Sequence, residues 1–250
     1  MKPFADHFSR LASEYATCRP GYPSELFAYL ADLAPARDLA WDCAAGTGQA
    51  TLPLSRWFRR VVGTDASAEM VAQAQSDPRI EYRVAPAEQS GLEPESVDLV
   101  TVAQALHWLE LAPFYEEVER VLVPGGVLAV WTYGVTRLED DVLDGIVSRF
   151  YSKVVGPYWP TERRHVESGY RTLPFPYVEL LPPTFAMRVE WDVEELAGYI
   201  RTWSATKRYL ETVGNDPVNQ LETQMRPLWG DPQSKKTVSW PLSLRVGRKG

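Results

Sequence analysis

Residues 39–49, with the sequence LAWDCAAGTGQ, form an apolar run that ends in Asp42 and then breaks into a glycine turn. In an open α/β sheet, a buried strand that stops at Gly-x-Gly brings a ligand to the carboxyl end of the first strand. The third glycine of a dinucleotide fingerprint is replaced here by Thr51, which weakens a phosphate-binding interpretation. A carboxylate four residues before Gly46 instead favours a cationic or amine-bearing ligand. The alternative is that Gly46 and Gly48 only form a tight turn between a strand and a helix.

Four more strands are predicted downstream of this turn. The second covers residues 61–65 and the third residues 79–85. The fourth begins at residue 97, and the fifth follows a Pro-Gly-Gly turn at residues 124–126. Strands that alternate with helices in this order predict an open parallel sheet wound on both faces, with the glycine turn at its switch point.

Asp65, at the end of the second predicted strand, has two interpretations. A carboxylate in this place accepts hydrogen bonds from both vicinal hydroxyls of a ribose. Asp65 also stands where it would cap the helix expected from about residue 67. Its place after a second buried strand favours the ribose-binding role.

Asp42, Ala44, Gly46 and Gly48 occupy the four places of the motif Asp-x-Gly-x-Gly-x-Gly, so the chain resembles the class I S-adenosylmethionine-dependent methyltransferases of the type 11 domain. The resemblance implies a Rossmann-like α/β fold with a mostly parallel seven-stranded sheet, helices on both faces and an antiparallel last strand. It also implies that these residues bind S-adenosylmethionine, whose sulfonium and ammonium groups are positive, and release S-adenosylhomocysteine. Ala44 departs from the motif, because its methyl group opposes the positive φ that glycine adopts freely.

The same resemblance assigns further cofactor residues. Ala87 and Glu88 match an Asp-Ala-Glu turn at the adenine, but Pro86 replaces its acid. Glu88 has an equally good alternative as an acid in the first turn of a helix. Gln104, in the polar turn after the fourth strand, is also assigned to the cofactor.

Tyr15 and Arg19 match a Tyr-x-x-x-Arg-Pro-x-Tyr-Pro segment of the trans-aconitate methyltransferase-like small-molecule subfamily. In that subfamily the segment precedes the first core helix and can close over the cofactor. Arg19 would offer paired hydrogen bonds to a carboxylate. The alternative is an amphipathic helix that packs on the domain.

The remainder of the chain predicts a single methyltransferase domain with a substrate side. A helical and aromatic insertion follows the fifth strand, with a helix over residues 138–155; a strand is expected at 185–191, a helix at 193–210 and a last strand at 237–246. Within residues 1–250 the expected parts are a helical cap (1–35), the cofactor-binding core (36–135), the insertion (136–180) and the elements that complete the sheet (181–250). Five residues are the candidates for lining an aromatic substrate pocket: Trp108, Tyr158, Trp159, Trp203 and Arg208.

The predicted reaction is methyl transfer to a small molecule, with a carboxylic acid favoured by the resemblance and by Arg19, Arg163, Arg164 and Arg208. A carboxylate is ionised at neutral pH and needs no base, whereas a phenol or an ammonium must first lose a proton. His107 follows the fourth strand and is the candidate base, unless it only orders its turn. The alternative functions are an NAD(P)-dependent oxidoreductase with a degenerate fingerprint and a non-catalytic module that binds S-adenosylmethionine.

Composition narrows the class of partner. The net charge is −7 and Lys and Arg are not clustered, so a nucleic-acid partner is not expected. Two cysteines make neither a disulfide framework nor a metal-ligand spacing, so no metal is expected. The N-terminus lacks the apolar core of a signal peptide and no apolar run is long enough to span a bilayer, so a cytoplasmic monomer or homodimer without a membrane partner is expected.

Overall fold

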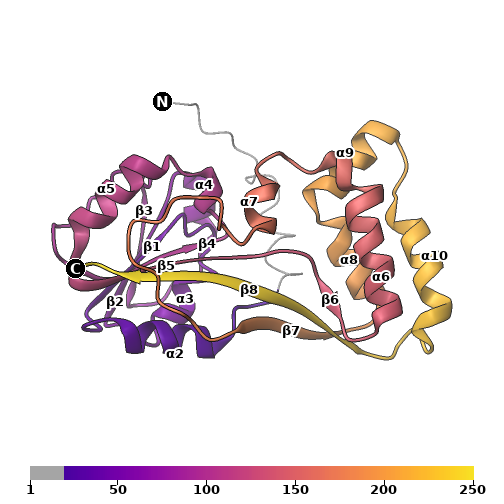
Figure 1. Cartoon of the computed structure of the whole chain (residues 1–250), viewed down its shortest axis with the longest axis horizontal. Helices are drawn as coiled ribbons and strands as arrows, with labels where there is room; N and C mark the ends of the chain where they lie inside the picture. Colours follow the sequence, from indigo (N-terminus) through magenta and orange to yellow (C-terminus); the bar gives the residue numbers. More distant parts are fainter. Residues whose placement is uncertain (1–19) are drawn as a thin grey trace.

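The computed structural model describes residues 20–250, so the predicted cofactor residues Tyr15 and Arg19 lie outside the described residues. The sheet has the strand order β3-β2-β1-β4-β5-β8-β6, and β7 also pairs with β8 (Figure 1). The strands are β1 Leu39–Cys43, β2 Arg60–Asp65, β3 Ile80–Val84, β4 Val97–Ala103, β5 Leu122–Tyr133, β6 Arg137–Leu138, β7 Phe185–Trp191 and β8 Lys236–Arg248. The predicted fold class is confirmed, although the described residues form eight strands rather than the seven expected.

The parallel half of the sheet, β3-β2-β1-β4-β5, has helices on both faces. Successive side chains of a strand point to opposite faces. Ala40 therefore packs in one hydrophobic cluster with α2 Ser24–Leu33, whereas Trp41 packs in another with α5 Leu111–Val121. These two helices lie on opposite sides of the sheet in Figure 1. All five residues of β1 are buried, which explains why this strand reads as a continuous apolar run up to the glycine turn.

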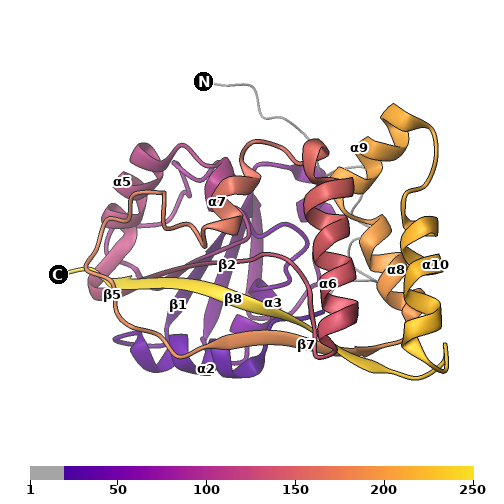
Figure 2. The same cartoon turned by 45° about the vertical axis from the view of Figure 1, so that its right-hand side comes forward.

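Strand β8 connects the sheet to a group of helices. Residues 242–248 pair antiparallel with β5, and residues 236–242 pair antiparallel with β7. The short strand β6 pairs with residues 238–239 of the second part. Figures 1 and 2 show β8 as one long strand that leaves the parallel sheet and reaches the helices at the other end of the molecule.

These helices form what we call the helical lobe, residues 141–158 and 193–229. The parallel half of the sheet is the sheet lobe, residues 24–133, together with α2, α3 Thr51–Leu54, α4 Ala68–Ala72 and α5. The helical lobe takes elements from both sides of β7. Its elements are α6 Asp141–Arg149, the π-helix η3 Phe150–Val154, the 3₁₀-helix η4 Gly156–Tyr158, α8 Val193–Arg201, α9 Ser204–Val213 and α10 Val218–Trp229. The short helix α7 Arg163–Glu167 lies outside it and contributes Val166 to the hydrophobic cluster of the sheet lobe.

Two helix predictions need correction. The helix expected at 138–155 begins only at Asp141, because Leu138 belongs to β6 and the side chain of Asp140 caps the helix. The helix expected at 193–210 is two helices, because α8 ends at Arg201 and Trp203 is extended at ψ 135°. The apolar periodicity continues across the break, which is why the sequence does not show it.

Within residues 20–250, no helix is long and apolar enough to cross a membrane. The same residues contain no group of three or more His, Cys, Asp and Glu side chains that could hold a metal ion.

Candidate active site

The glycine turn after β1 has left-handed backbone at every second residue. Ala44, Gly46 and Gly48 have φ of 55°, 56° and 90°. The alanine therefore adopts the positive φ that its methyl group was expected to oppose, at a cost of about 1–2 kcal/mol. The turn is held to β2 by the N–H of Ala45, which donates to the carbonyl of Thr64 at 2.9 Å. Strained backbone of this kind is found where the surrounding structure fixes it, often at functional sites.

The two glycines of the turn have different surroundings. A Cβ added to Gly48 would lie 2.1 Å from the hydroxyl oxygen of Tyr82 on β3, so glycine is needed there for packing. A Cβ added to Gly46 would meet no atom of residues 20–250 within 4 Å. Among these described residues, the turn is therefore packed against the protein at Gly48 and left uncovered at Gly46.

Asp42 is a buried carboxylate beside this turn, with 1% of its surface exposed. Its two oxygens accept from the hydroxyls of Thr51, at 2.5 Å, and Thr101, at 2.8 Å. Burial raises the pKa of the carboxyl to about 6, and the charge of Asp65 acts in the same direction. No Lys or Arg of residues 20–250 forms an ion pair with it, so a cationic ligand would supply the missing opposite charge.

Asp65 holds the glycine turn. One of its oxygens accepts from the N–H of Gly46 at 2.8 Å, and the other accepts from the N–H of Ser67 at 2.9 Å. Helix α4 Ala68–Ala72 is capped by the Ser67 side chain, which accepts from Met70, so the interpretation of Asp65 as the cap is wrong. The sequence did not reveal that Asp65 and the turn are bonded directly.

Ala87 and Glu88 lie in a turn between β3 and β4. Ala87 is buried and Glu88 is exposed. No helix forms between β3 and β4, so the alternative of Glu88 as an acid in the first turn of a helix is wrong.

Gln104 follows β4 with a φ of 58°, a second left-handed position at the carboxyl edge of the sheet. Its amide nitrogen donates to the carbonyl of Tyr133 at 3.1 Å, and its oxygen accepts from the hydroxyl of Thr132. The side chain is therefore fixed against the end of β5.

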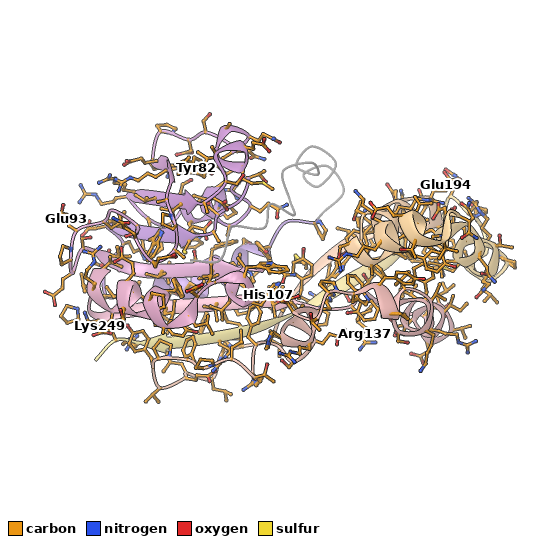
Figure 3. All side chains as sticks on the ribbon, turned by 90° about the horizontal axis from the view of Figure 1, so that it is seen from above. Tyr82, Glu93, His107, Arg137, Glu194 and Lys249 are labelled. Carbon is orange, nitrogen blue, oxygen red and sulfur yellow. The ribbon has the colours of Figure 1, made fainter. Side chains whose placement is uncertain are left out.

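His107 lies in the 3₁₀-helix η2 Leu106–Trp108, on the side of the sheet lobe that faces the helical lobe (Figure 3). Its Nδ1 is 2.9 Å from the hydroxyl of Tyr170, which the sequence analysis did not single out. Burial lowers the pKa of the ring to about 4, and the positive charge of Arg163 acts in the same direction. His107 is therefore neutral at neutral pH, and so weak a base is poorly matched to proton abstraction at that pH.

The predicted pocket residues divide into two groups. Trp108 is 40% exposed and its ring lies against that of His107, with 4.7 Å between centroids. Tyr158, Trp159 and Trp203 pack within the hydrophobic cluster of the helical lobe, and Arg208 donates to the carbonyl of Tyr158 at 3.4 Å. Trp203 is 6% exposed, and the rings of Phe150, Tyr151, Trp159 and Tyr199 surround it.

A depression of about 390 Å³ lies between α7 and the helical lobe. Its lining includes Tyr151, Trp159, Arg163, Arg164 and Glu167. The guanidinium of Arg163 stacks on the indole of Trp159, 4.5 Å from the ring centroid, and its Nε donates to the hydroxyl of Tyr151 at 2.8 Å. Trp159 is therefore the one predicted pocket residue that lines this depression, and Trp203 lines neither this depression nor the next.

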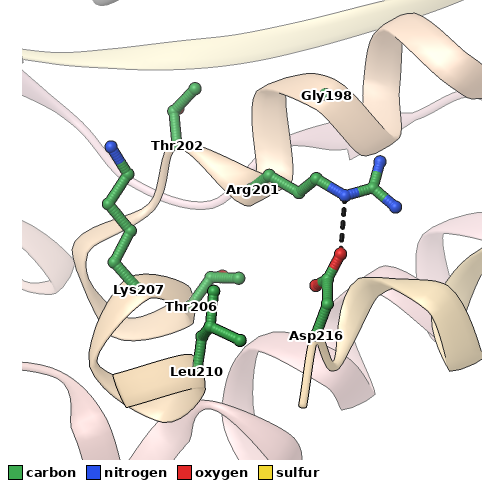
Figure 4. Close-up of a pocket in the computed structure, with 7 residues that line it drawn as sticks. All are labelled: Gly198, Arg201, Thr202, Thr206, Lys207, Leu210 and Asp216. Carbon is green, nitrogen blue, oxygen red and sulfur yellow. Dashed lines mark hydrogen bonds and ion pairs between the residues drawn. The ribbon is translucent and has the colours of Figure 1, made fainter. Parts of the chain in front are cut away.

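A second depression, of about 370 Å³, lies within the helical lobe between α8 and α9 (Figure 4). None of the predicted site residues lines it. Its Arg201 is paired with Asp216 at 2.8 Å and with Glu222 at 2.5 Å, so its charge is already compensated. We assign this depression no part in the reaction.

Comparison with known proteins identifies the family. Residues 41–130 match the family model described as a methyltransferase domain. A protein of Dictyostelium discoideum that is named as a methyltransferase is 31% identical over 252 residues, covering 98% of this chain and 96% of that protein. A protein of Saccharomyces cerevisiae, named as an S-adenosylmethionine-dependent methyltransferase, is 33% identical over 131 residues, 49% of this chain and 45% of its own.

A solved structure extends the likeness to the whole fold. A protein from Anaeromyxobacter dehalogenans, described as a type II methyltransferase, superposes with a TM-score of 0.89 at 44% identity and covers 92% of this chain and 97% of its own. Because these relatives are methyltransferases by name, the alternative prediction of an NAD(P)-dependent oxidoreductase is wrong. With its glycine turn, its buried Asp42 and its mixed sheet, the chain belongs to the S-adenosylmethionine-dependent class I methyltransferases.

Proposed function

We propose that this methyltransferase transfers its methyl group to a carboxylate of a small-molecule acceptor, as enzymes of the trans-aconitate methyltransferase-like subfamily do. The proposal divides the work between two places. The glycine turn with Asp42 and Asp65 would hold the cofactor, and the depression beside α7 would hold the acceptor.

The cofactor end is supported by charge and by space. Asp42 is a buried carboxylate that forms no ion pair with a described Lys or Arg, and S-adenosylmethionine carries a sulfonium and an ammonium group. No atom of residues 20–250 would lie within 4 Å of a Cβ on Gly46, so the described part of the chain leaves that side of the turn uncovered for a ligand. Asp65 keeps lone pairs beyond the two used by Gly46 and Ser67, so it can also accept from ribose hydroxyls.

The acceptor class is carried by one observation, the arrangement of Arg163. Its Nε is held by Tyr151, and its plane lies on the indole of Trp159. Within residues 20–250 its two terminal nitrogens make no hydrogen bond. A guanidinium fixed at one edge and open at the other matches a carboxylate with two parallel hydrogen bonds.

The charge of the depression agrees with an acidic acceptor. Arg163 and Arg164 outnumber Glu167, whose carboxylate already accepts from the Tyr151 hydroxyl at 2.6 Å. The charge of Arg163 also reaches His107, where it helps to lower the pKa of the ring. This links the depression electrostatically to the carboxyl edge of the sheet.

The reaction balances without a base. The bound cofactor supplies an electrophilic methyl group on a positively charged sulfur. An oxygen of the acceptor carboxylate forms the new carbon–oxygen bond as the carbon–sulfur bond breaks, and that electron pair stays on sulfur. No proton moves, so the protein contributes by aligning the two reactants, an effect worth roughly 7–11 kcal/mol in well-oriented systems. The low pKa of His107 agrees with a reaction that needs no base.

The test is a methyl-transfer assay with radiolabelled S-adenosylmethionine and a panel of small carboxylic acids. A product that releases labelled methanol in alkali is a methyl ester and supports the proposal. A base-stable labelled product would contradict carboxylate methylation. Cofactor binding in calorimetry without turnover of any acid would favour the non-catalytic module.

Arg163→Met should lower kcat/KM for the acid roughly tenfold to a hundredfold, the effect of losing hydrogen bonds to a charged group. Arg163→Lys should fall between, because lysine keeps the charge but loses the fork. Arg188→Met, at an exposed position of β7, removes the same charge away from the depression and is the control. Equal losses in the Arg163→Met and Arg188→Met variants would contradict a specific role for Arg163.

A further inference from the structure

Two consecutive residues after α7 have left-handed backbone conformations. Gly169 and Tyr170 both have positive φ, 60° and 62°. A Cβ at Gly169 would lie 2.8 Å from the side chain of Ser243 on β8, so the turn is pressed directly on the sheet. For a bulky residue such as Tyr170 the left-handed conformation is a genuine outlier.

A buried arginine of β8 holds this turn. Arg245 is 6% exposed and donates to the carbonyls of Tyr170, at 2.7 Å, and Leu173, at 2.8 Å. Its other nitrogens pair with the carboxylate of Glu179 at 2.7 and 3.1 Å. Each nitrogen of the guanidinium thus helps to fix the segment that carries Tyr170, and its partners compensate the cost of burying it.

This arrangement fixes the position of the Tyr170 side chain. The ring is fully buried in the hydrophobic cluster of the sheet lobe, and its hydroxyl lies 2.9 Å from Nδ1 of His107. The backbone N–H of Leu106 also approaches the phenol oxygen and, as a donor, favours its ionised form. Burial outweighs this effect and raises the pKa of the phenol well above its ordinary value, so Tyr170 keeps its proton.

We infer that Tyr170 is a positioning residue whose hydroxyl donates to Nδ1 of His107, so that the ring carries its own proton on Nε2. His107 then presents an N–H donor, rather than a base, at the carboxyl edge of β4. This inference rests on the proposed function, because the Nε2–H of His107 can orient the oxygen of an acceptor carboxylate, which is already ionised and needs no base. In this interpretation, the strained turn and Arg245 together fix a single tautomer of His107.

The tautomer is read directly by nitrogen-15 NMR of histidine-labelled protein. His7 and His165 are the other two histidines, and their replacement assigns the signals. In the unsubstituted protein we expect an Nδ1 without a proton and an Nε2 with one. A proton on Nδ1 would overturn the inference, and this result requires no variant to fold.

Tyr170→Phe removes the donor and keeps the ring. We expect the Nδ1 signal of His107 to shift, the ring to populate both tautomers, and kcat to fall roughly tenfold with the affinity for S-adenosylmethionine unchanged. Tyr115→Phe is the matched control, because its hydroxyl donates to the carbonyl of Pro174 at 2.8 Å and does not touch His107. Unchanged His107 signals in Tyr170→Phe would contradict the inference.

Replacement of His107 separates a donor from a base. Glutamine places an amide N–H near the position of Nε2 but cannot take up a proton, so His107→Gln should keep more than a tenth of the activity while His107→Ala loses more. Equal losses would contradict the donor role. If no carboxylic acid is methylated but the tautomer is as expected, the proposed acceptor is wrong and the role of Tyr170 stands.

Discussion

The glycine turn of the sheet lobe and the aromatic cluster of the helical lobe are held in place by different interactions. The aromatic cluster consists of Trp203 and the four rings around it: Phe150, Tyr151, Trp159 and Tyr199. The turn has left-handed backbone at Ala44, Gly46 and Gly48, and it lies between the buried carboxylate of Asp42 and the half-buried carboxylate of Asp65. The aromatic cluster is held by ring contacts around Trp203, with centroids 5.7–6.3 Å apart. In the glycine turn, backbone strain and a buried charge lower the stability of the fold. In the aromatic cluster, the burial of apolar rings raises it.

The difference teaches where function and stability can be separated. Removing the buried charge beside the turn should leave the fold intact or improve it while weakening the cofactor site. Removing a ring from the aromatic cluster should do the reverse, because close-packed apolar side chains contribute mainly to folding. The comparisons that follow test this division, from the largest expected effect to the smallest.

Trp203→Ala should have the largest effect on stability. A buried tryptophan replaced by alanine leaves a cavity and typically costs about 3–5 kcal/mol. Urea unfolding should show this loss, while calorimetry on the folded variant should show unchanged affinity for S-adenosylmethionine. Trp108→Ala, at a site 40% exposed, is the control and should cost less than about 1 kcal/mol. A stable Trp203→Ala variant would show that the cluster is a loosely filled pocket instead of a core.

Asp42→Asn should act in the opposite direction. The raised pKa of about 6 means that the folded protein holds this proton more tightly than the unfolded chain does. The buried charge therefore lowers stability progressively as pH rises from about 4 to about 6, by about 3 kcal/mol at neutral pH. Asparagine removes that charge, so the cofactor-free variant should be more stable at pH 7.5 and nearly unchanged at pH 4, while affinity for S-adenosylmethionine falls roughly a hundredfold.

Asp98 provides the control for this variant. It is also buried on the sheet, at 5% exposure, but its carboxylate accepts from the backbone N–H groups of Asp38, at 2.9 Å, and Leu39, at 3.0 Å. Asp98→Asn weakens these bonds and should destabilise the protein by about 1 kcal/mol without changing cofactor affinity. If both variants destabilise equally, the buried charge of Asp42 is not a cost to the fold.

The same division explains what the sequence could predict. The glycine turn was predictable because positive φ selects residue types locally. Strands β1 and β7 have the expected limits or nearly so, because β1 is an apolar run and β7 alternates apolar with charged residues from Met187 to Trp191. The partners of the turn were not predictable. Thr101 and Tyr82 come from β4 and β3, and only the folded sheet brings them to Asp42 and Gly48.

The aromatic residues show the opposite limit. A high tryptophan content predicts that aromatic rings are buried, but it does not distinguish a substrate pocket from a hydrophobic core. Trp203 was expected to line a pocket, whereas the structure buries it among four rings. Tyr170 was missed for a related reason. Its role depends on the left-handed backbone of residues 169–170 and on Arg245, 75 residues further along the chain. No periodicity or local motif records such a contact.

The finest comparison lies within the turn, between Ala44→Gly and Gly46→Ala. The two positions have nearly the same φ, 55° and 56°, so the exchange of alanine and glycine has opposite and nearly equal effects on backbone strain. The strain of about 1–2 kcal/mol exceeds the roughly 0.4–1 kcal/mol that alanine contributes by restricting the unfolded chain, so Gly46→Ala should lower, and Ala44→Gly should raise, the free energy of unfolding by up to about 1 kcal/mol. They differ in space, because the new methyl group of Gly46→Ala enters the open side of the turn. Affinity for S-adenosylmethionine should therefore fall about tenfold in Gly46→Ala and stay unchanged in Ala44→Gly. Equal affinities in calorimetry would mean that the cofactor does not lie against Gly46, and that the glycine serves only the turn.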